Sequence, residues 1–192
     1  MVRLFKLKVT LIDSEPSVWR SVLVRDELIL SDFHFAMQII FGWQNAHLHQ
    51  WLVPTDGKLT QTSIRNATYY ANADMGLENT EEADWVCLYE VLREPKHSII
   101  YEYDMGDSWR HAVTLEEVLP FDGKTIVKVL DGKHAAPPED SGGVYGFPDL
   151  MAAAKNRKHP DHVHAKDWLG DWDANAFDLD AINAALAKAF KE

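Results

Sequence analysis

The segment Tyr101–Trp109, with the sequence Tyr-Glu-Tyr-Asp-Met-Gly-Asp-Ser-Trp, combines acidic side chains with the residues of a short turn. Glu102 and Asp104 alternate with two tyrosines before the turn, and a similar alternation resumes after it. A period of two is typical of β-strands, so the pattern predicts an antiparallel pair joined by a tight turn at residues 104–107. Such a turn needs only the glycine and one aspartate for its geometry, which leaves further carboxylates for chemistry.

Several side chains around this turn are candidates for catalysis. Asp107 lies across the turn from Asp104, and His111 follows on the second strand. Clustered carboxylates can hold a hard cation such as Mg²⁺, or can divide into acid and base roles when their pKa values differ. In that case His111 would serve as a general base. The alternative is structural, because aspartates at a turn accept backbone N–H groups and Glu102 would be a solvated strand residue.

A second acidic segment, Ala135–Gly143, places Glu139 and Asp140 between two prolines and two adjacent glycines. Prolines stiffen the chain, and glycines permit positive φ angles or close backbone contacts, so the two acids would be presented at a bend. The segment lacks the lysine and the helix-start spacing of a phosphate-binding loop. It is either a rigid packing loop or a site loop that contributes Glu139 or Asp140.

The histidines form two groups that offer metal ligands. His47 and His49 are two residues apart in a strand predicted over residues 47–53, so they would share one face of it. His159 and His162 lie beside aspartates at the entry to a predicted helix. A zinc site requires three or four converging ligands, and a divalent ion, Mg²⁺ or Zn²⁺, is the cofactor that the sequence allows. The candidate metal ligands are His159, His162, Asp104 and Asp107.

Aromatic side chains near these segments offer contacts to a ligand. The candidates for ligand binding are Trp109, Trp43, His47 and His49. In the motif Trp168-Leu-Gly-Asp-Trp172, Gly170 is expected just past the end of a helix. The two tryptophans of that motif would pack the C-terminal helices onto the sheet, or would form a stacking platform for a ring.

The charge distribution disfavours a nucleic-acid partner. The net charge is −11; residues 1–60 are neutral, and residues 61–192 carry the whole excess of acid without any basic stripe. Because non-specific nucleic-acid binding depends on Lys and Arg that neutralise phosphates, a protein partner, a small molecule or a metal ion is expected instead. No apolar run approaches the ~20 residues of a membrane span, and the strand pattern starts near Met1 without a signal segment, so a cytoplasmic location is expected.

Hydrophobic periodicity predicts an α+β fold, as a single domain over residues 1–192 with a mostly antiparallel sheet. Strands precede helices in the chain, and no cofactor-binding fingerprint or nucleophile elbow is present. Residues 63–80 are polar and are expected to form a variable loop. Strands are expected at residues 3–12, 18–24, 47–53, 98–118 (a hairpin) and 126–130. Helices are expected from a Ser31 cap to Gly42, over residues 147–156 and 161–169, and from an Asp178 cap to residue 190.

Five groups of motifs, spread over nearly the whole chain, resemble one known family. They are Leu7-Lys-Val-Thr-Leu-Ile12 with Pro16-Ser-Val-Trp-Arg20, Gly42-Trp43 with His47-Leu-His49, the turn segment with His111, Pro137-Pro-Glu-Asp-Ser-Gly-Gly143, and a C-terminal set containing His159-Pro-Asp-His162, Trp168-Leu-Gly170, Phe177-Asp-Leu179 and Asn183. In this order they resemble the plasmid pRiA4b ORF-3-like family, whose members are often labelled insertion-sequence passenger proteins of the TnpR type.

The resemblance implies an α+β, roll-like domain and no particular activity. Many relatives carry cysteines around the acidic loop, at positions that are Val129, Ala136 and Ser141 in this chain. A zinc site built on those thiols is therefore excluded here. A serine resolvase needs a nucleophilic serine among arginines and a basic DNA-binding end, and this acidic chain has neither.

Two hypotheses about function follow. The first is a non-enzymatic binding or interaction module, an accessory protein of mobile-element or plasmid origin, because no complete catalytic constellation is present while rigid acidic loops are. The second is a metal-assisted hydrolase or nuclease-like enzyme. Its acids would be Glu102, Asp104, Asp107, Glu139 and Asp140, with His111 as the base.

Overall fold

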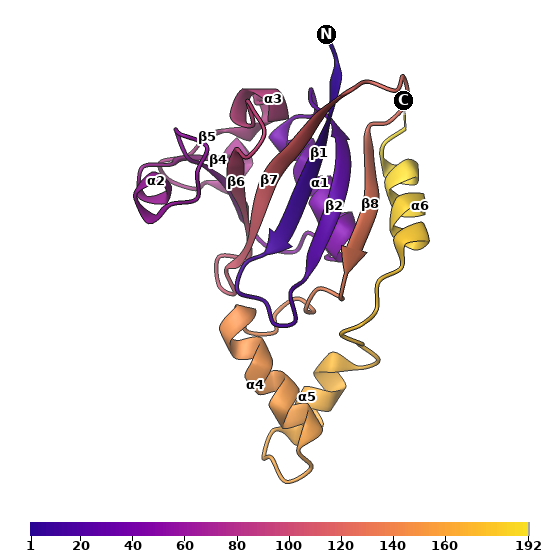
Figure 1. Ribbon diagram of the computed structural model, residues 1–192. Coiled ribbons are helices and arrows are strands. Elements are labelled where there is room, and N and C mark those ends of the chain that lie inside the picture. Colours follow the sequence, from indigo (N-terminus) through magenta and orange to yellow (C-terminus); the bar gives the residue numbers. More distant parts are fainter. Residues whose placement is uncertain (192) are drawn as a thin grey trace.

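A computed structural model describes residues 1–191 and shows an eight-stranded sheet with helices packed against it (Figure 1). The strand order is β5-β4-β3-β6-β7-β1-β2-β8, and every pairing is antiparallel except that of β4 with β5. The strands are β1 (Arg3–Leu11), β2 (Trp19–Arg25), β3 (His49–Val53), β4 (Thr68–Ala71), β5 (Glu81–Glu82), β6 (Ser98–Tyr103), β7 (Trp109–Pro120) and β8 (Val127–Lys133).

The helices lie against one face of the sheet, along its edge, and beyond one end of it. They are α1 (Leu30–Phe41), α2 (Gln61–Arg65), α3 (Leu88–Val91), α4 (Gly143–Lys155), α5 (His162–Leu169) and α6 (Leu179–Ala189), with the 3₁₀ turns η1 (Ala73–Met75) and η2 (Ala83–Trp85). The predicted α+β class with a mostly antiparallel sheet is thus confirmed. Within residues 1–191, no helix combines the length and the apolar character that a membrane span requires.

The core lies between α1 and the inner face of the sheet. Alternate residues of β1, among them Phe5, Leu7 and Val9, are buried and belong to one cluster with Phe33 and Met37 of α1. Burial of this apolar area is the main term that stabilises such a layer pair, at about 25 cal/mol per Å². The alternation in the sequence predicted this strand face correctly, because a strand that is covered on one side needs apolar residues at every second position.

Helix α1 begins differently from the sequence prediction. The predicted Ser31 cap is wrong: the helix starts at Leu30 after Ile29, and no side chain caps it. Instead, the backbone N–H of Leu30 donates to the carbonyl of Val86, 2.9 Å away, so a neighbouring segment satisfies the helix start. At the other end Gly42 adopts φ 76° and ends the helix, as predicted.

The region predicted to be a polar loop, residues 63–80, contains regular structure. Strand β4 pairs with β3 through Tyr70 and Trp51, and α2 precedes it. The sequence pattern missed this strand because it is only four residues long and gains its hydrogen bonds from a partner that is distant in the sequence. Helix α4 also begins at Gly143, earlier than the predicted residue 147.

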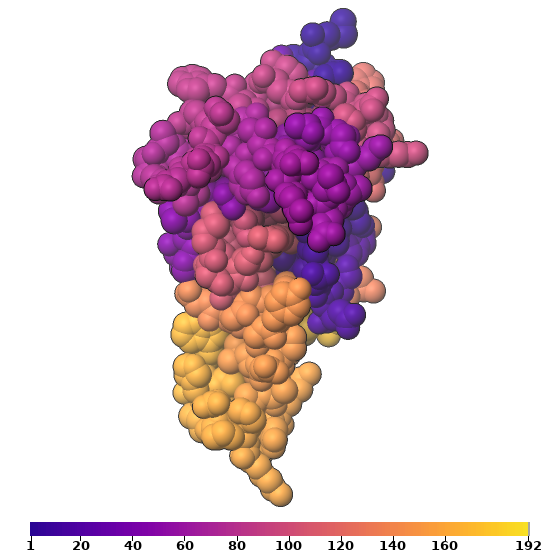
Figure 2. All heavy atoms as spheres, turned by 90° about the vertical axis from the view of Figure 1, so that its left-hand side faces the viewer, coloured from indigo at the N-terminus to yellow at the C-terminus, as the bar shows by residue number. Residues whose placement is uncertain are grey.

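The two helices α4 and α5 project from one end of the sheet, while α6 returns to lie beside β8 (Figure 1). Figure 2 shows the α4–α5 pair as a narrower extension of the molecule. The prediction that both tryptophans of the 168–172 motif pack helices onto the sheet is therefore wrong for Trp168, which is 44% exposed. Trp172 does anchor this region, since its indole N–H donates to the Ala136 carbonyl at 2.8 Å.

Candidate metal centre

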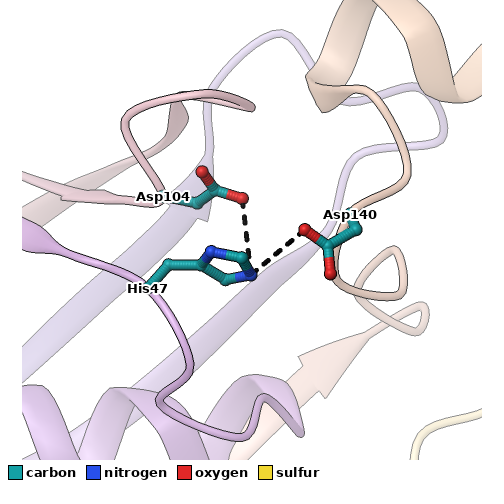
Figure 3. A group of neighbouring side chains, drawn as sticks. All are labelled: His47, Asp104 and Asp140. Carbon is teal, nitrogen blue, oxygen red and sulfur yellow. Dashed lines mark ion pairs between the residues drawn. The ribbon is translucent and has the colours of Figure 1, made fainter.

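Three loops bring His47, Asp104 and Asp140 together (Figure 3). The Nε2 atom of His47 lies 3.2 Å from Oδ1 of Asp140 and 3.8 Å from Oδ2 of Asp104. One ligand atom from each of the three residues lies within 4.8 Å of the other two. Among residues 1–191 this is the one group of three or more His, Cys, Asp or Glu side chains with such convergence.

The local structure of the 104–108 loop aims Asp104 at the histidine. Strand β6 ends at Tyr103 and β7 starts at Trp109, so the predicted tight turn at residues 104–107 is in fact a five-residue loop. Asp104 has φ 60°, a left-handed conformation that aspartate tolerates better than most residues. Its Oδ1 accepts the N–H of Gly106 at 2.9 Å, which leaves Oδ2 to face His47.

The acidic loop is fixed to the hairpin by hydrogen bonds on both sides of Asp140. Before it, the hydroxyl of Tyr103 donates to Oε1 of Glu139, which also accepts the N–H of Gln44 at 3.1 Å. After it, the N–H of Gly142 donates to Oδ2 of Asp107 at 3.0 Å. Asp140 itself has φ 53°. Asp140 is therefore presented at the bend, as the sequence predicted, by a loop that is tied at two points.

The hydrogen bond from Tyr103 has an electrostatic consequence. Burial, and then the bond to the Glu139 carboxylate, raise the pKa of the Tyr103 phenol above its usual range. The phenol therefore stays protonated at neutral pH and keeps donating to Glu139. Trp43 supports the same loop, because its indole N–H donates to the Pro137 carbonyl at 3.0 Å.

The spacing and chemistry of the three side chains fit a divalent ion. Ligands bound at about 2.0–2.2 Å from one ion lie roughly 3–3.5 Å apart when their directions differ by ~90–110°. The two distances from His47 Nε2 are close to this range. That atom is shielded from solvent and makes no aligned hydrogen bond to any of residues 1–191, so it is free to bind an ion between the carboxylates. A mixed nitrogen and oxygen set suits Zn²⁺ or Mn²⁺.

Glu102, a predicted acid of the site, lies on the other face of the sheet from the core aromatics. Its carboxylate accepts hydrogen bonds from Ser108 Oγ at 2.6 Å, Gln50 Nε2 at 2.7 Å and Arg110 Nε at 2.8 Å. Burial would raise the pKa of Glu102, but these donors outweigh it and the pKa is lowered. Glu102 is therefore an anion whose oxygens are satisfied by these three donors, and it does not belong to the group of His47, Asp104 and Asp140.

The predicted base and the predicted aromatic ligands are core residues. His111 and Trp109 are fully buried, and Trp43 packs on Tyr103 with ring centroids 5.0 Å apart. Burial lowers the pKa of His111 to about 3. Its ring nitrogens face the backbone of Tyr101 and Trp109 without an aligned hydrogen bond. His111 stays neutral and does not belong to the group formed by His47, Asp104 and Asp140.

His47 and His49 do not share a face, so that expectation is wrong. Strand β3 begins only at His49, and His47 belongs to the preceding loop. His49 points into the core, where its ring stacks on that of His34 of α1. The predicted pairing failed because it assumed a strand over both residues.

His159 and His162 also stay apart from Asp104 and Asp107: His162 Nδ1 contacts the Ala153 carbonyl at 3.0 Å and His159 faces Asp161.

The sequence pointed to each of the three clustered residues, but for different roles: His47 as a ligand-binding residue, Asp104 as a catalytic acid or metal ligand, and Asp140 as a catalytic acid. Their convergence depends on the pairing of β3 with β6 and on the hydrogen bonds that hold the acidic loop, which no local pattern encodes.

Arg20 was missed although a signal existed: it alternates with Val18, Val22 and Val24, all of them buried. A charged residue in such an apolar series is expected on the core face.

The comparisons with known proteins agree with the fold and leave the activity open. The family model described as plasmid pRiA4b ORF-3-like protein matches residues 3–181. The chain is 29% identical over 184 residues to the uncharacterized protein y4hQ of Sinorhizobium fredii, covering 94% of this chain and 89% of that one. It also resembles a crystal structure of a protein of unknown function, MM3350 from Methanosarcina mazei Go1, with a TM-score of 0.77, 27% identity, and coverage of 93% and 97%.

The α+β fold with its mostly antiparallel sheet is thus shared with a solved structure. The chain belongs to the plasmid pRiA4b ORF-3-like family.

Proposed function

We propose that the chain is a divalent-cation-binding module whose ion is held by His47, Asp104 and Asp140. The observation that carries this proposal is the convergence of one imidazole nitrogen and two carboxylate oxygens within 4.8 Å of one another. The nitrogen ligand favours Zn²⁺ or Mn²⁺ over Mg²⁺, because Mg²⁺ prefers oxygen ligands and retains several waters. An accessory role in a mobile element or plasmid, which the family resemblance implies, is part of the proposal.

The ion would act by joining three loops into one surface. Each ligand comes from a different loop, so a bound ion would fix the 104–108 loop and the acidic loop relative to residue 47. Asp140 also lines an open cleft of about 640 Å³ along α4 and α5, together with Asp149, Asp161 and the exposed ring of Trp168. The acidic lining favours a basic protein segment or a cationic small molecule over nucleic acid.

A metal-assisted hydrolase is the second candidate. Catalytic metal sites keep a coordination position free beside three protein ligands, and three is the number available here. The side chain of Asp140 is 57% exposed and faces both the histidine and the cleft. An ion bound there would supply Lewis acidity to a group that enters the cleft.

Calorimetric titration of the full chain with ZnCl₂, MnCl₂ and MgCl₂, paired with thermal unfolding, tests the proposal. We expect one ion to bind per chain, with Zn²⁺ or Mn²⁺ tighter than Mg²⁺, and the melting temperature to rise with ion concentration. The Asp140→Asn variant should weaken binding by at least about tenfold, because it replaces an anionic ligand at an exposed position.

Asp149→Asn is the matched control, since Asp149 lines the same cleft without contributing to the cluster. His159→Gln controls for zinc that binds the second histidine group. Absence of heat and of a melting shift with all three ions would refute the proposal, and so would loss of binding in His159→Gln but not in Asp140→Asn. Turnover of a chromogenic ester or phosphodiester by the wild type, lost in Asp140→Asn, would favour the hydrolase.

A further inference from the structure

Arg20 is a charged residue that lies in the core without an anionic partner. It is 2% exposed, on the face of β2 that also carries Val22 and Val24. Among residues 1–191 no carboxylate forms an ion pair with its guanidinium. Burying a charge without a counterion is costly, so its retention requires an explanation.

The guanidinium is held in place but is only partly satisfied. Nη1 donates to the carbonyls of Trp19 at 2.8 Å and Lys133 at 3.0 Å. The group lies over the rings of Phe41 and Phe177, with 5.3 Å and 4.6 Å from Cζ to the ring centroids. The Nε–H is buried and finds no acceptor within residues 1–191. These contacts fix the orientation of the guanidinium and leave some of its five N–H donors without an acceptor.

Arg20 lines a cavity of about 380 Å³ between the end of α1, the start of the acidic loop and the segment that leads into α6. Its walls are mainly apolar and aromatic, and they include Ile39, Phe41, Trp172, Phe177 and Ile182. This size and this lining are typical of a small-molecule site, in which a few polar groups orient an apolar ligand.

The packing around the arginine shows why the cavity has its shape. Gly132 of β8 pairs with Arg20, and a Cβ at position 132 would lie 2.7 Å from both Arg20 Cδ and Phe177 Cζ. Only glycine at this position leaves room for the side chain and the ring together. Burial lowers the pKa of Arg20 to about 10, and the group is still a cation at neutral pH.

We propose that this cavity binds a small monocarboxylate with an apolar or aromatic body, whose carboxylate pairs with Arg20. Arginine recognises carboxylates through two parallel N–H donors. Arg20 is the sole cation among the residues that line the cavity, and Glu139 is the sole acid. The site therefore offers one positive charge at most, which favours a monoanion over a phosphate. The inference is independent of the proposed metal.

Phenylacetate is a suitable probe, with phenylacetamide as its neutral isostere and inorganic phosphate as the competing anion. Titrations of the full chain in EDTA should detect phenylacetate binding, with phenylacetamide and phosphate at least about tenfold weaker. The ¹⁵N and ¹H resonances of the Arg20 Nε–H group should shift on addition of phenylacetate. This readout requires no substitution at the site.

Two variants separate binding from folding. Ile182→Trp fills the cavity and leaves Arg20 in place. Arg20→Lys keeps the positive charge and removes the two parallel N–H donors of the guanidinium. Both should weaken phenylacetate binding by at least about tenfold, while Asp180→Asn, an exposed change on the same helix, should not. Equal binding of the amide and the acid, an unperturbed Arg20 resonance, or no binding at millimolar concentration would overturn the proposal.

Discussion

The imidazole rings of His34 and His49 lie parallel in the core, with 3.4 Å between their centroids and 4° between their planes. His34 contacts the Tyr101 hydroxyl at 2.7 Å and Asn45 Oδ1 at 2.8 Å, whereas neither nitrogen of His49 makes an aligned hydrogen bond. Burial lowers the pKa of His34 to about 4; burial and then the neighbouring His34 lower that of His49 to about 3. The stack is therefore neutral in the folded protein.

Stability is expected to fall as the pH drops from about 6.5 toward 4. In this window the unfolded chain takes up protons on these histidines and the folded chain does not, so the unfolded state gains free energy of protonation. Each such histidine contributes a slope of about 1.4 kcal/mol per pH unit. Urea unfolding between pH 8 and pH 4.5 measures this slope. His49→Leu should reduce it, and an unchanged slope in that variant would contradict the assignment.

Replacement of Asn183 is expected to destabilise the outer edge of the sheet. Asn183 of α6 accepts the N–H of Val129 at 2.8 Å and donates to the carbonyl of the same residue at 2.9 Å. These bonds satisfy strand β8 on its outer side, where no further strand of the described chain pairs with it. Asn183→Leu should lower the free energy of unfolding by roughly 1–3 kcal/mol, because two backbone groups lose their partner. Denaturant titration measures this, with the exposed Asn175→Ala as a control that should stay near wild type.

A side chain at position 143 should separate the acidic loop from the hairpin. Gly143 has φ 67°, and a Cβ there would lie 2.2 Å from the carbonyl oxygen of Asp107. Gly123 has φ 84° but open space around it, so Gly123→Ala is the matched control for backbone strain alone. We expect Gly143→Ala to cost roughly 1–3 kcal/mol more than Gly123→Ala in denaturant unfolding. It should also weaken the proposed ion binding. Equal effects of the two variants would show that the loop contact is not tight.

Glu102→Gln should affect stability and leave the proposed ion site intact. The substitution removes the charge that Arg110, Ser108 and Gln50 surround, so the free energy of unfolding should fall by roughly 1–3 kcal/mol at pH 7. Because the folded pKa of Glu102 is lowered, its contribution is present above the unfolded pKa, and protonation removes it as the pH falls through the folded value. Calorimetry should find unchanged ion affinity; a tenfold loss would place Glu102 in the site.

The strands with clear alternation and the ends of two helices were predictable from the sequence. Strands β1 and β2 lie within two residues of their predicted bounds, because a half-buried strand needs apolar side chains at every second residue. Asp178 caps α6 by accepting the N–H of Ala181 at 2.9 Å, and Gly42 ends α1. These features depend on neighbours close in the sequence, so the residue types alone specify them.

The tertiary structure alone decided which polar side chains meet. His47, Asp104 and Asp140 come from three loops, and their convergence follows from the pairing of β3 with β6 and from the bond between Tyr103 and Glu139. His47 faces this cluster while His49 enters the core, because the strand begins between them. Arg20 likewise acquires its cavity from α1, the acidic loop and the segment before α6. Long-range pairing sets these contacts, and a local sequence pattern carries no information about which distant segment will supply the partner.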